Sequence, residues 1–294
     1  MAPSSAKSAD KQAPGVYRRR IGDALVTTVN DGFLDVPYEI FRGATKDEMQ
    51  ALMRQAFRAA PPRLTVNAFV IETDRNTILV DSGGGSTTVY SMGLLPENLK
   101  AAGYGPDDFD IVLATHIHPD HTSGLLNAEG EPAFPRAEIV VHQDELEFWS
   151  NQNLRGASAA ATPYLESADR VLAAYRERFR PVRGGVVAEG VTQLPLPGHT
   201  PGHCGYRLDS AGETLVMWGD TVHVPEIQIP RPEVTSEFDV DERLAAQNRS
   251  RIFEYVASER LLVTGGHIHL PGFAHVIPDG RGYRLVPEAW RVAL

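Results

Sequence analysis

Four side chains that can ligate a metal ion stand within six consecutive residues of this 294-residue chain. They are His116, His118, Asp120 and His121, and only Thr115 separates them from the apolar stretch 111–114. Imidazole nitrogen and carboxylate oxygen together suit zinc, iron, manganese or cobalt. Because the whole chain holds ten histidines, chance clustering explains this stretch poorly, and the sequence predicts a metal site here.

Strand geometry predicts how these side chains are presented. In extended backbone, residues i and i+2 point to the same face, so His116 and His118 can offer two imidazoles side by side. Pro119 disfavours helical backbone at His118 and keeps that residue extended. Asp120 is expected to continue the same face while His121 points elsewhere, so that one loop serves two points in space.

Three further candidate ligands follow other predicted strands, and each has a glycine beside it that allows close approach of the backbone. Any one of them alone would be weak evidence, because histidine and aspartate are common at strand ends. Together with the six-residue stretch they form a set. They are His199, Asp220 and His267.

The elements that must position these side chains are inferred from hydrophobic periodicity. Strand patterns and helix patterns recur in each half of the chain, which predicts an α/β fold of the αββα sandwich type, with two central mixed β-sheets flanked by helices. Strands are expected at 24–29, 65–72, 77–80, 110–114, 137–141, 191–196, 204–208, 214–217, 260–263, 274–277 and 283–286. Helices are expected at 96–102, 142–150, 164–179 and 241–257, the last with Asp239 as its cap.

The chain is expected to form one domain behind a short leader. Residues 1–15 are small, polar and proline-bearing, which indicates disorder, and they lack the apolar core of a secretory signal. Residues 16–294 form the predicted domain, with a helical insertion at about 151–185. Within that insertion, the small residues of 156–161 suit either a mobile flap over a site or a plain surface excursion.

Composition excludes several classes of protein. The chain is 42% apolar and 22% charged, with a formal net charge of −10, and it has no apolar run of 18 residues. An acidic balance argues against a nucleic-acid partner, and the absence of an apolar run argues against a membrane span. The one basic run, Arg18–Arg20, is interpreted as a solvated strand edge. The single cysteine, Cys204, excludes an intrachain disulfide, and the cytoplasm is the default location.

Taken together, these motifs resemble those of the metallo-β-lactamase-fold hydrolases, over nearly all of the chain after the leader. The shared pattern is His-x-His-x-Asp-His, followed at a distance by His, Asp and His. The sequence is most similar to the methyl parathion hydrolase group, whose members include organophosphate hydrolases, arylesterases and lactonases. The residues that suggest this subgroup are 99–104, 116–124, 148–149, 198–202 and 282–287.

The resemblance implies a site for two divalent metal ions, zinc in the first place, with iron, manganese or cobalt as alternatives. It places Asp81, at the end of the strand 77–80, beside the metals as a partner of their ligands. The implied ligands are His116, His118 and His199 for the first ion, Asp120, His121 and His267 for the second, and Asp220 as a bridge between them.

Such a site predicts a hydrolase. Two divalent cations roughly 3.5–4 Å apart bring the pKa of bound water toward ~7 and polarise the oxygen of the substrate. The predicted reaction is hydrolysis of a neutral small-molecule ester by a hydroxide held at the metals, with Asp120 or Asp220 moving the proton onward. A lactone or aryl ester is the expected substrate, with phosphotriester hydrolysis as a promiscuous activity.

Residues expected to contact the substrate come from the same resemblance. His223 stands where typical lactonases of the fold carry a hydrogen-bonding tyrosine and where some methyl parathion hydrolases have an apolar residue; as a histidine it could donate a hydrogen bond or act as a general acid. Trp149 and Phe148 form a wall of the pocket or simply pack along their helix. The apolar segment 33–41 overhangs the pocket or forms a dimer contact, because the resembling group is commonly dimeric.

Several other residues were weighed against this set. His203, His269 and His275 are extra histidines near the ligand motifs, and His269 is the nearest rival to His267. Cys204 is expected to pack beside a strand. Two alternative functions remain. One is a thioesterase of the glyoxalase II type, although such enzymes usually have basic residues that bind glutathione and this chain has only scattered arginines. The other is a non-catalytic, metal-stabilised binding protein.

Overall fold

A computed structural model describes residues 12–85, 91–151 and 162–294 of the chain. Most of the proposed leader and the small-residue stretch 156–161 lie outside these ranges. Within them, no helix is long and apolar enough to cross a membrane.

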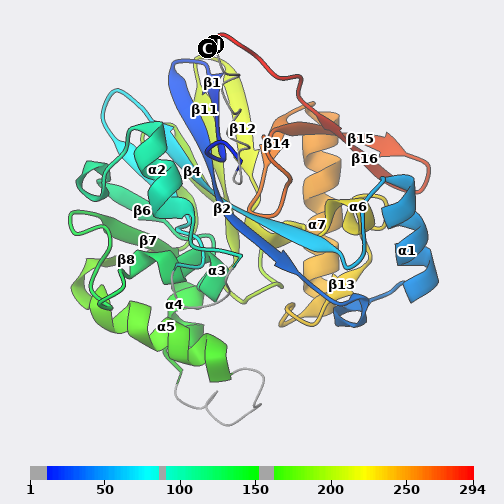
Figure 1. The fold of residues 1–294 in the computed structure, drawn as a ribbon, viewed down its shortest axis with the longest axis horizontal. Coiled ribbons are helices and arrows are strands. Elements are labelled where there is room, and N and C mark those ends of the chain that lie inside the picture. The colour runs from blue at the N-terminus through cyan, green and yellow to red at the C-terminus, as the bar shows by residue number, and fades with distance from the viewer. Residues whose placement is uncertain (1–11, 86–90, 152–161) are drawn as a thin grey trace, which may run out of the picture.

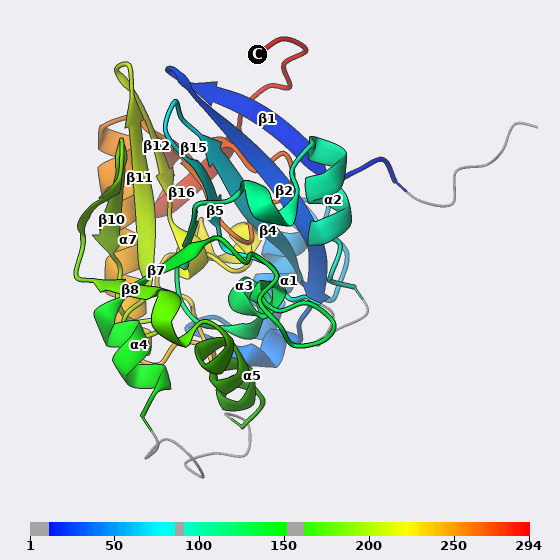
Figure 2. The same cartoon turned by 90° about the vertical axis from the view of Figure 1, so that its left-hand side faces the viewer.

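Two β-sheets lie face to face in the middle of the molecule (Figures 1 and 2). The first has the order β1-β2-β4-β5-β6-β7-β8 and the second the order β16-β15-β14-β12-β11-β10-β9. The first sheet consists of β1 (Val16–Ile21), β2 (Ala24–Asp35), β4 (Arg63–Glu72), β5 (Thr77–Val80), β6 (Ile111–Leu113), β7 (Glu138–His142) and β8 (Phe179–Val182). The second consists of β9 (Gly185–Ala188), β10 (Val191–Pro195), β11 (Cys204–Ser210), β12 (Glu213–Met217), β14 (Leu262–Thr264), β15 (Ala274–Asp279) and β16 (Gly282–Pro287).

Both sheets are mixed. In the first, β1, β2, β4 and β5 pair antiparallel, whereas β5 to β8 pair parallel. In the second, β12 and β14 pair parallel and the other pairs are antiparallel. A short pair, β3 (Phe41–Arg42) with β13 (Thr235–Ser236), stands apart from the sheets.

Helices cover the outer faces of the sheets, so the predicted αββα sandwich is confirmed. Figure 1 shows α2, α4 and α5 beside the first sheet and α7 beside the second. The helices are α1 (Lys46–Gln55), α2 (Leu95–Ala102), α3 (Pro119–Thr122), α4 (Gln143–Trp149), α5 (Thr162–Ala174), α6 (Pro225–Gln228) and α7 (Glu242–Ser258).

Alternation along the strands builds the core in layers. In β4, Phe69 and Ile71 face the space between the two sheets, whereas Ala68 and Val70 face the helices outside the first sheet. Successive strand residues point to opposite faces, so a strand in the middle of the sandwich is apolar on both sides. On the far side of the second sheet, residues of α7 complete a third apolar layer.

The helix predicted at 164–179 is too long at its C-terminal end. Helix α5 ends at Ala174, and Phe179 begins strand β8. The buried Tyr175 follows the helix, and its hydroxyl donates to Leu125 O (2.9 Å) and accepts from Phe134 N (3.1 Å). The apolar spacing continues past the end of the helix because the following strand also packs on the core. This strand, β8, belongs to the first sheet.

Two segments near the N-terminus have definite places. Strand β1, which contains Arg18–Arg20, is an edge strand, as predicted. The basic run is less solvated than expected, because Arg18 and Arg19 are half-buried and Arg19 forms an ion pair with Glu288 at 2.9 Å. The apolar segment 33–41 buries Tyr38, Ile40 and Phe41 against α1 and α6 of its own chain. Helix α1 had not been predicted, although Thr45 and Glu48 form a capping box at its start.

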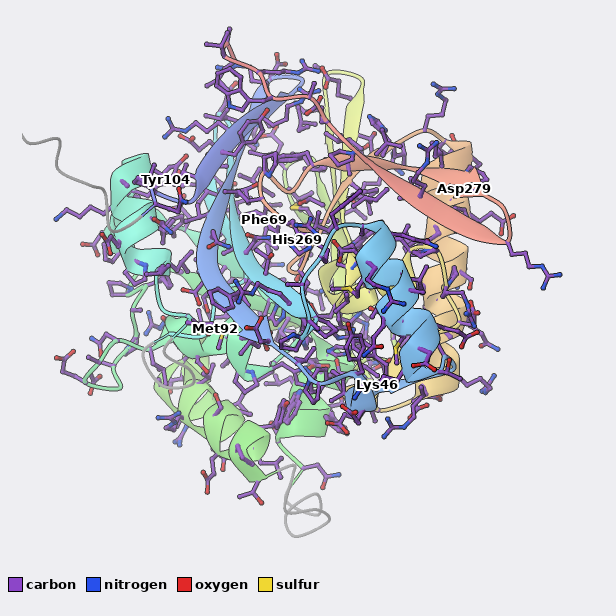
Figure 3. All side chains as sticks on the ribbon, turned by 45° about the vertical axis from the view of Figure 1, so that its right-hand side comes forward. Lys46, Phe69, Met92, Tyr104, His269 and Asp279 are labelled. Atoms are coloured by element: carbon purple, nitrogen blue, oxygen red, sulfur yellow. The ribbon has the colours of Figure 1, made fainter. Side chains whose placement is uncertain are left out.

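The inter-sheet layer should dominate stability. Replacing Phe69, which is 2% exposed on β4 (Figure 3), by alanine leaves a cavity between the sheets and is expected to lower the free energy of unfolding by ~3–5 kcal/mol. The same replacement at Phe57, which is 96% exposed, should change it by less than ~0.5 kcal/mol. Denaturant unfolding monitored by circular dichroism measures both, and equal losses would contradict this account of the core.

Candidate metal centre

Seven polar side chains meet at the ends of four strands. The loop and short helix after β6, and the loops after β10, β12 and β14, carry them to one place between the two sheets. Among these seven, two groups have ligand atoms close enough together to share a metal ion. They are His116, His118 and His199, and Asp120, His121, Asp220 and His267.

The first group has the spacing of a coordination shell. His199 Nε2 lies 3.2 Å from His116 Nε2 and 3.0 Å from His118 Nδ1. Zinc–nitrogen bonds of about 2.0–2.1 Å in tetrahedral geometry place neighbouring ligand atoms about 3.3 Å apart. All three rings are buried, and their ligand nitrogens lie close enough together to hold one ion.

The second group is centred on Asp220. The distance from Asp220 Oδ1 to His121 Nε2 is 3.1 Å, and that from Asp220 Oδ2 to His267 Nε2 is also 3.1 Å. Asp120 Oδ2 lies 3.5 Å from His121 Nε2 and 3.6 Å from His267 Nε2. Asp220 Oδ2 is also 3.5 Å from His199 Nε2, so this carboxylate stands between the two groups.

Two facing atoms of the second group are arranged to bind a cation and do not form a hydrogen bond with each other. His121 Nε2 and Asp220 Oδ1 are buried and lie 3.1 Å apart, yet within the described chain neither has a hydrogen-bond partner. Buried polar atoms are rarely left unpaired. Both instead face a common point, and the donor set of imidazole and carboxylate therefore fits two divalent metal ions.

The route of Asp120 to the centre differs from the prediction. His118 is extended, with φ −79° and ψ 154°, as Pro119 requires, but Pro119–Thr122 forms the helical turn α3. Asp120 therefore does not continue the face of His116 and His118. Proline at the first position of a helix is favourable, and the turn carries Asp120 and His121 toward the second group.

Hydrogen bonds at the outer nitrogens fix the orientation of the rings. The Nδ1–H of His121 donates to Asp81 Oδ2 (2.9 Å), and the Nδ1–H of His267 donates to Thr65 O (2.7 Å). Each bond leaves the Nε2 lone pair facing the centre. Asp81, the expected partner, also accepts from the backbone N–H and hydroxyl of Thr115, which ties it to the loop of the first histidines.

Asp239 has a different role from the predicted one. It does not cap helix α7; Asp241 does, by accepting from Leu244 N. Asp239 Oδ1 instead accepts from His199 Nδ1–H at 3.0 Å, while Arg249 lies 3.8 Å from its other oxygen. The sequence position of Asp239, two residues before the helix cap, does not predict its contact with His199, because this contact depends on how α7 packs against the second sheet.

The protonation states of the centre follow from burial and charge. Burial lowers the pKa of His118 to about 4 and holds that of His199 well below its usual range, so these rings are neutral. Burial raises the pKa of Asp220, but the charges of His121 and His267 outweigh it and hold the pKa well below its usual range. Neutral imidazoles and ionised carboxylates are the forms that bind metal. The nearby carboxylates, Asp220 first, raise the pKa of His121 and His267 against the effect of burial, so these two rings would release a proton when metal binds.

Glu145 joins the loops that carry the first three histidines. This residue, 0% exposed in α4, accepts from Ile117 N (2.8 Å) and Trp149 Nε1 (2.6 Å) on Oε1. On Oε2 it accepts from Thr200 Oγ1 (2.5 Å) and Gly202 N (3.1 Å). Ile117 lies between the two histidines of the first loop and Thr200 directly follows the third, so one carboxylate links both loops. Sequence reasoning missed it because its partners are distant in the chain.

Two glycines allow the closest approaches. A Cβ atom on Gly202 would lie 2.1 Å from Glu145 N, and one on Gly219, whose φ is +55°, would lie 2.6 Å from His203 Nε2. His203 itself donates to Leu196 O and accepts from Asp220 N. It therefore holds the backbone of Asp220 in place.

Aromatic side chains border the first histidine group. The rings of Trp149 and Tyr164 have their centroids 5.6 and 5.1 Å from that of His118, and Phe148 packs on Trp149. Tyr164 had not been singled out, although it was expected to begin a helix. Burial raises its pKa to about 12, so it presents a neutral phenol.

His223 also lies at the centre. Its Nε2 is 3.5 Å from Asp220 Oδ2, and burial lowers its pKa to about 3, so the ring is neutral. A hydrogen bond from this ring to a substrate stays a prediction.

The remaining histidines and the cysteine lie outside both ligand groups. His275 Nδ1–H donates to Leu261 O, and Cys204 is a buried free thiol at the start of β11. His269 contacts Thr65 Oγ1 at 2.8 Å and Glu226 Oε1 at 3.0 Å. It therefore does not compete with His267.

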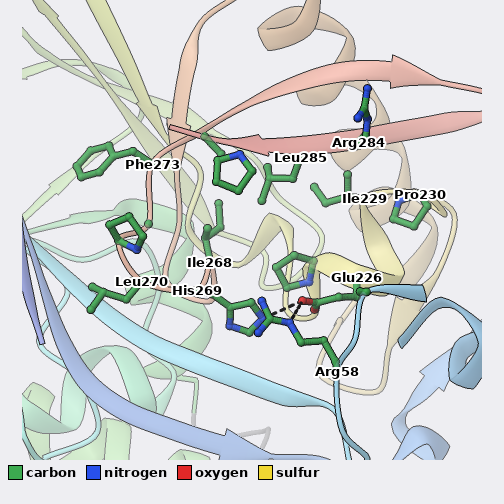
Figure 4. A pocket seen from close by; sticks show the side chains of 16 residues that line it. Arg58, Glu226, Ile229, Pro230, Ile268, His269, Leu270, Phe273, Arg284 and Leu285 are labelled. Atoms are coloured by element: carbon green, nitrogen blue, oxygen red, sulfur yellow. Dashed lines mark hydrogen bonds and ion pairs between the residues drawn. The ribbon is translucent and has the colours of Figure 1, made fainter. Parts of the chain in front are cut away.

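His269 lines a separate cavity of about 350 Å³ between α6 and the last two strands (Figure 4). Its walls are mainly apolar, and the carboxylate of Glu226 pairs there with Arg58 at 2.7 Å as well as with His269. This cavity, although large, holds none of the predicted metal ligands, and its acidic group is already neutralised.

Glu226 should make the free energy of unfolding depend on pH in the acidic range. Burial raises its pKa, but the hydrogen bond from His269 outweighs this and lowers it from the ordinary 4.5 to about 2. The folded state is then favoured at pH above ~4.5, and up to ~3 kcal/mol is lost as pH falls toward ~2. Denaturant unfolding in this range should show a shallower decline for Glu226→Gln than for wild type. Glu237→Gln, at an exposed carboxylate, should follow wild type, and a parallel decline in all three would contradict the assignment.

Glu145→Gln should weaken one metal site more than the other. The amide can accept hydrogen bonds on only one oxygen, so one of the two loops that carry His116, His118 and His199 loses its hydrogen bond to residue 145. The affinity for the ion bound by these histidines is expected to fall ~10–100-fold. Stepwise metal titration against a chelator measures this. Tyr175→Phe, which removes a buried hydroxyl bond away from the centre, controls for lost stability, and equal weakening of both ions in both variants would refute the linking role.

Comparison with known proteins places this geometry in a family. An N-acyl homoserine lactonase of Bacillus cereus is 25% identical over 245 residues, which are 76% of this chain and 86% of that protein. An atrochrysone carboxyl ACP thioesterase of Passalora fulva is 30% identical over 159 residues, 53% of this chain and 38% of the relative.

Solved structures share the whole fold. AbOPH, described as a hydrolase in the β-lactamase superfamily, superposes with a TM-score of 0.91 at 30% identity, over 96% of this chain and 100% of that one. AidC, described as a dizinc quorum-quenching lactonase, superposes with a TM-score of 0.89 at 23% identity, over 95% and 99%. The sequence model of the metallo-β-lactamase superfamily matches residues 61–267, a range that contains all seven predicted ligands. The chain therefore belongs to the metallo-β-lactamase superfamily.

Proposed function

We propose that this protein hydrolyses a neutral lactone at a centre of two divalent metal ions, zinc in the first place. The observation that carries the proposal is the position of Asp220, whose two oxygens face the two ligand groups at 3.1–3.5 Å. The proposed ligands are His116, His118 and His199 for one ion, Asp120, His121 and His267 for the other, and Asp220 for both.

The kinship to lactonases supports the substrate class. The Bacillus cereus relative is named as an N-acyl homoserine lactonase, and the match covers most of both chains. The aromatic side chains of Trp149, Phe148 and Tyr164 next to His118 suit an acyl group better than a charged one. Aryl esters and phosphotriesters share a neutral, polarisable oxygen and are proposed as weaker substrates.

The side chains of the centre divide the work. Two bound divalent ions supply a nucleophile from water at neutral pH and stabilise negative charge on the carbonyl oxygen. Asp220 holds both positions at a fixed separation. The carboxylate of Asp120 has a lowered pKa, because the charges of His121 and His267 outweigh the effect of burial. It is ionised at rest and, being 17% exposed, would take the proton released by the attacking water and pass it to the leaving alkoxide.

A thioester is the second candidate substrate. The Passalora fulva relative is named as an acyl-carrier thioesterase, and the same centre would attack a thioester carbonyl. The chain spans 38% of that relative, so the support is narrower than for a lactone.

A substrate panel tests the proposal. Purified metal-replete protein is assayed with N-acyl homoserine lactones, an unsubstituted lactone, p-nitrophenyl acetate, paraoxon and an acyl thioester. The expected result is the highest kcat/KM for an acylated lactone. His118→Ala and Asp220→Asn should each lose at least ~10²-fold in kcat/KM, whereas His275→Leu, outside the centre, should keep the wild-type value. Protein that holds two metal ions and hydrolyses none of these compounds would point instead to a metal-stabilised binding protein.

A further inference from the structure

His223 is a buried imidazole without a partner. Its side chain is 1% exposed, and among the residues that the structure describes neither Nδ1 nor Nε2 has a hydrogen-bond partner. Burying a polar group without a hydrogen bond is unfavourable. A group bound at the centre would supply the partner that the His223 ring lacks.

The ring lies between the two ligand groups. Its centroid is 4.8 Å from that of His199, and it stacks on His267 at 5.7 Å with 24° between the planes. Its Nε2 is 3.5 Å from Asp220 Oδ2, the same separation as between His199 Nε2 and that oxygen. His199, Asp220 and His223 thus form a third group whose ligand atoms all lie within 4.8 Å of one another.

Surrounding contacts hold the residue but leave its ring nitrogens unpaired. The backbone N–H groups of His223 and Val224 both donate to Gln228 Oε1, at 2.7 and 3.2 Å, and Gln228 is itself buried in α6. Phe238 packs on the ring with centroids 5.8 Å apart. This arrangement fixes the backbone while Nε2 faces Asp220, as the Nε2 atoms of His199 and His267 do.

We propose that His223 is a further ligand of the metal centre, binding through Nε2 the ion that His199 and Asp220 share. The inference rests on the proposed two-metal centre and replaces the role of hydrogen-bond donor to substrate that was expected at this position. A fourth imidazole beside His116, His118 and His199 would raise the coordination number of that ion and leave fewer positions on it for substrate oxygen.

Metal binding in the absence of substrate tests the proposal. Wild type and His223→Leu are stripped of metal and titrated with zinc against a competing chelator, and the visible absorption of the cobalt(II) forms is compared. The expected result for His223→Leu is at least tenfold weaker binding of one ion per chain, unchanged binding of the other, and an altered cobalt(II) spectrum. His275→Leu removes an imidazole outside the centre and should leave affinities and spectrum as in wild type.

Folding is followed separately from metal binding. Because both ring nitrogens of His223 are unpartnered, the metal-free His223→Leu protein should unfold at the same temperature as metal-free wild type or a higher one. His223→Tyr, which supplies the hydroxyl donor of the resembling lactonases, is the second variant. A ligand role predicts weakened binding of one ion in His223→Tyr as well, whereas a donor role predicts unchanged metal binding.

Unchanged affinity for both ions and an unchanged cobalt(II) spectrum in His223→Leu would overturn the proposal, whatever its activity. The outcome is independent of the substrate panel. If wild type binds two ions but hydrolyses no lactone, the proposed function fails while the ligand role of His223 is still decided by titration.

Discussion

The buried carboxylate of Asp220 is the constraint around which this structure is arranged. An ionised group out of water is unfavourable unless positive charge compensates it, and Asp220 has imidazoles on both sides at 3.1–3.5 Å. The backbone N–H of Asp220 donates to His203 Nε2, and Gly219, the residue before it, adopts a positive φ. Without a cation, protonated His121 must balance the charge, because Asp220 and Asp120 hold its pKa well above the usual range against the effect of burial. Bound metal ions would displace that proton and supply the same compensation.

The centre lies where the two sheets meet, and its ligands come from both. The loop after β6 belongs to the first sheet, and the loops after β10, β12 and β14 belong to the second. The apolar layer between the sheets therefore sets the distance between ligands as well as the stability of the fold. Glu145 adds a polar tie across the same boundary, since it binds the backbone after β6 and the loop after β10. Such supports keep the ligand rings in place although nitrogen atoms of the first group lie only 3.0–3.2 Å apart.

The outer contacts of the ligands come from parts of the chain that carry no ligand themselves. Asp81 at the end of β5, Asp239 before α7 and the Thr65 carbonyl in β4 each accept the outer N–H of a different histidine. His223 differs from these three histidines, because its backbone is fixed by Gln228 while its ring nitrogens have no partner in the described chain. A seven-residue description of the centre therefore leaves out both its supports and a side chain that faces it.

Local sequence patterns are enough to name the donor groups of the centre and to predict most of the elements that carry them. Strand β5 was predicted with the bounds 77–80 that it has, and the six-residue stretch 116–121 identified the centre, because alternation, proline and ligand type are local properties. Local pattern failed where neighbouring elements share apolar character, as at Phe179, and where a turn replaced extended backbone, as at Asp120. Tertiary packing, in contrast, sets the hydrogen-bond partners of Glu145 and the contact of Asp239 with His199. It also sets the position of Tyr164 beside His118 and the orientation of the His223 ring. These depend on contacts between residues that are mostly far apart along the chain, set by how the two sheets and their helices pack, and no short-range pattern records that packing.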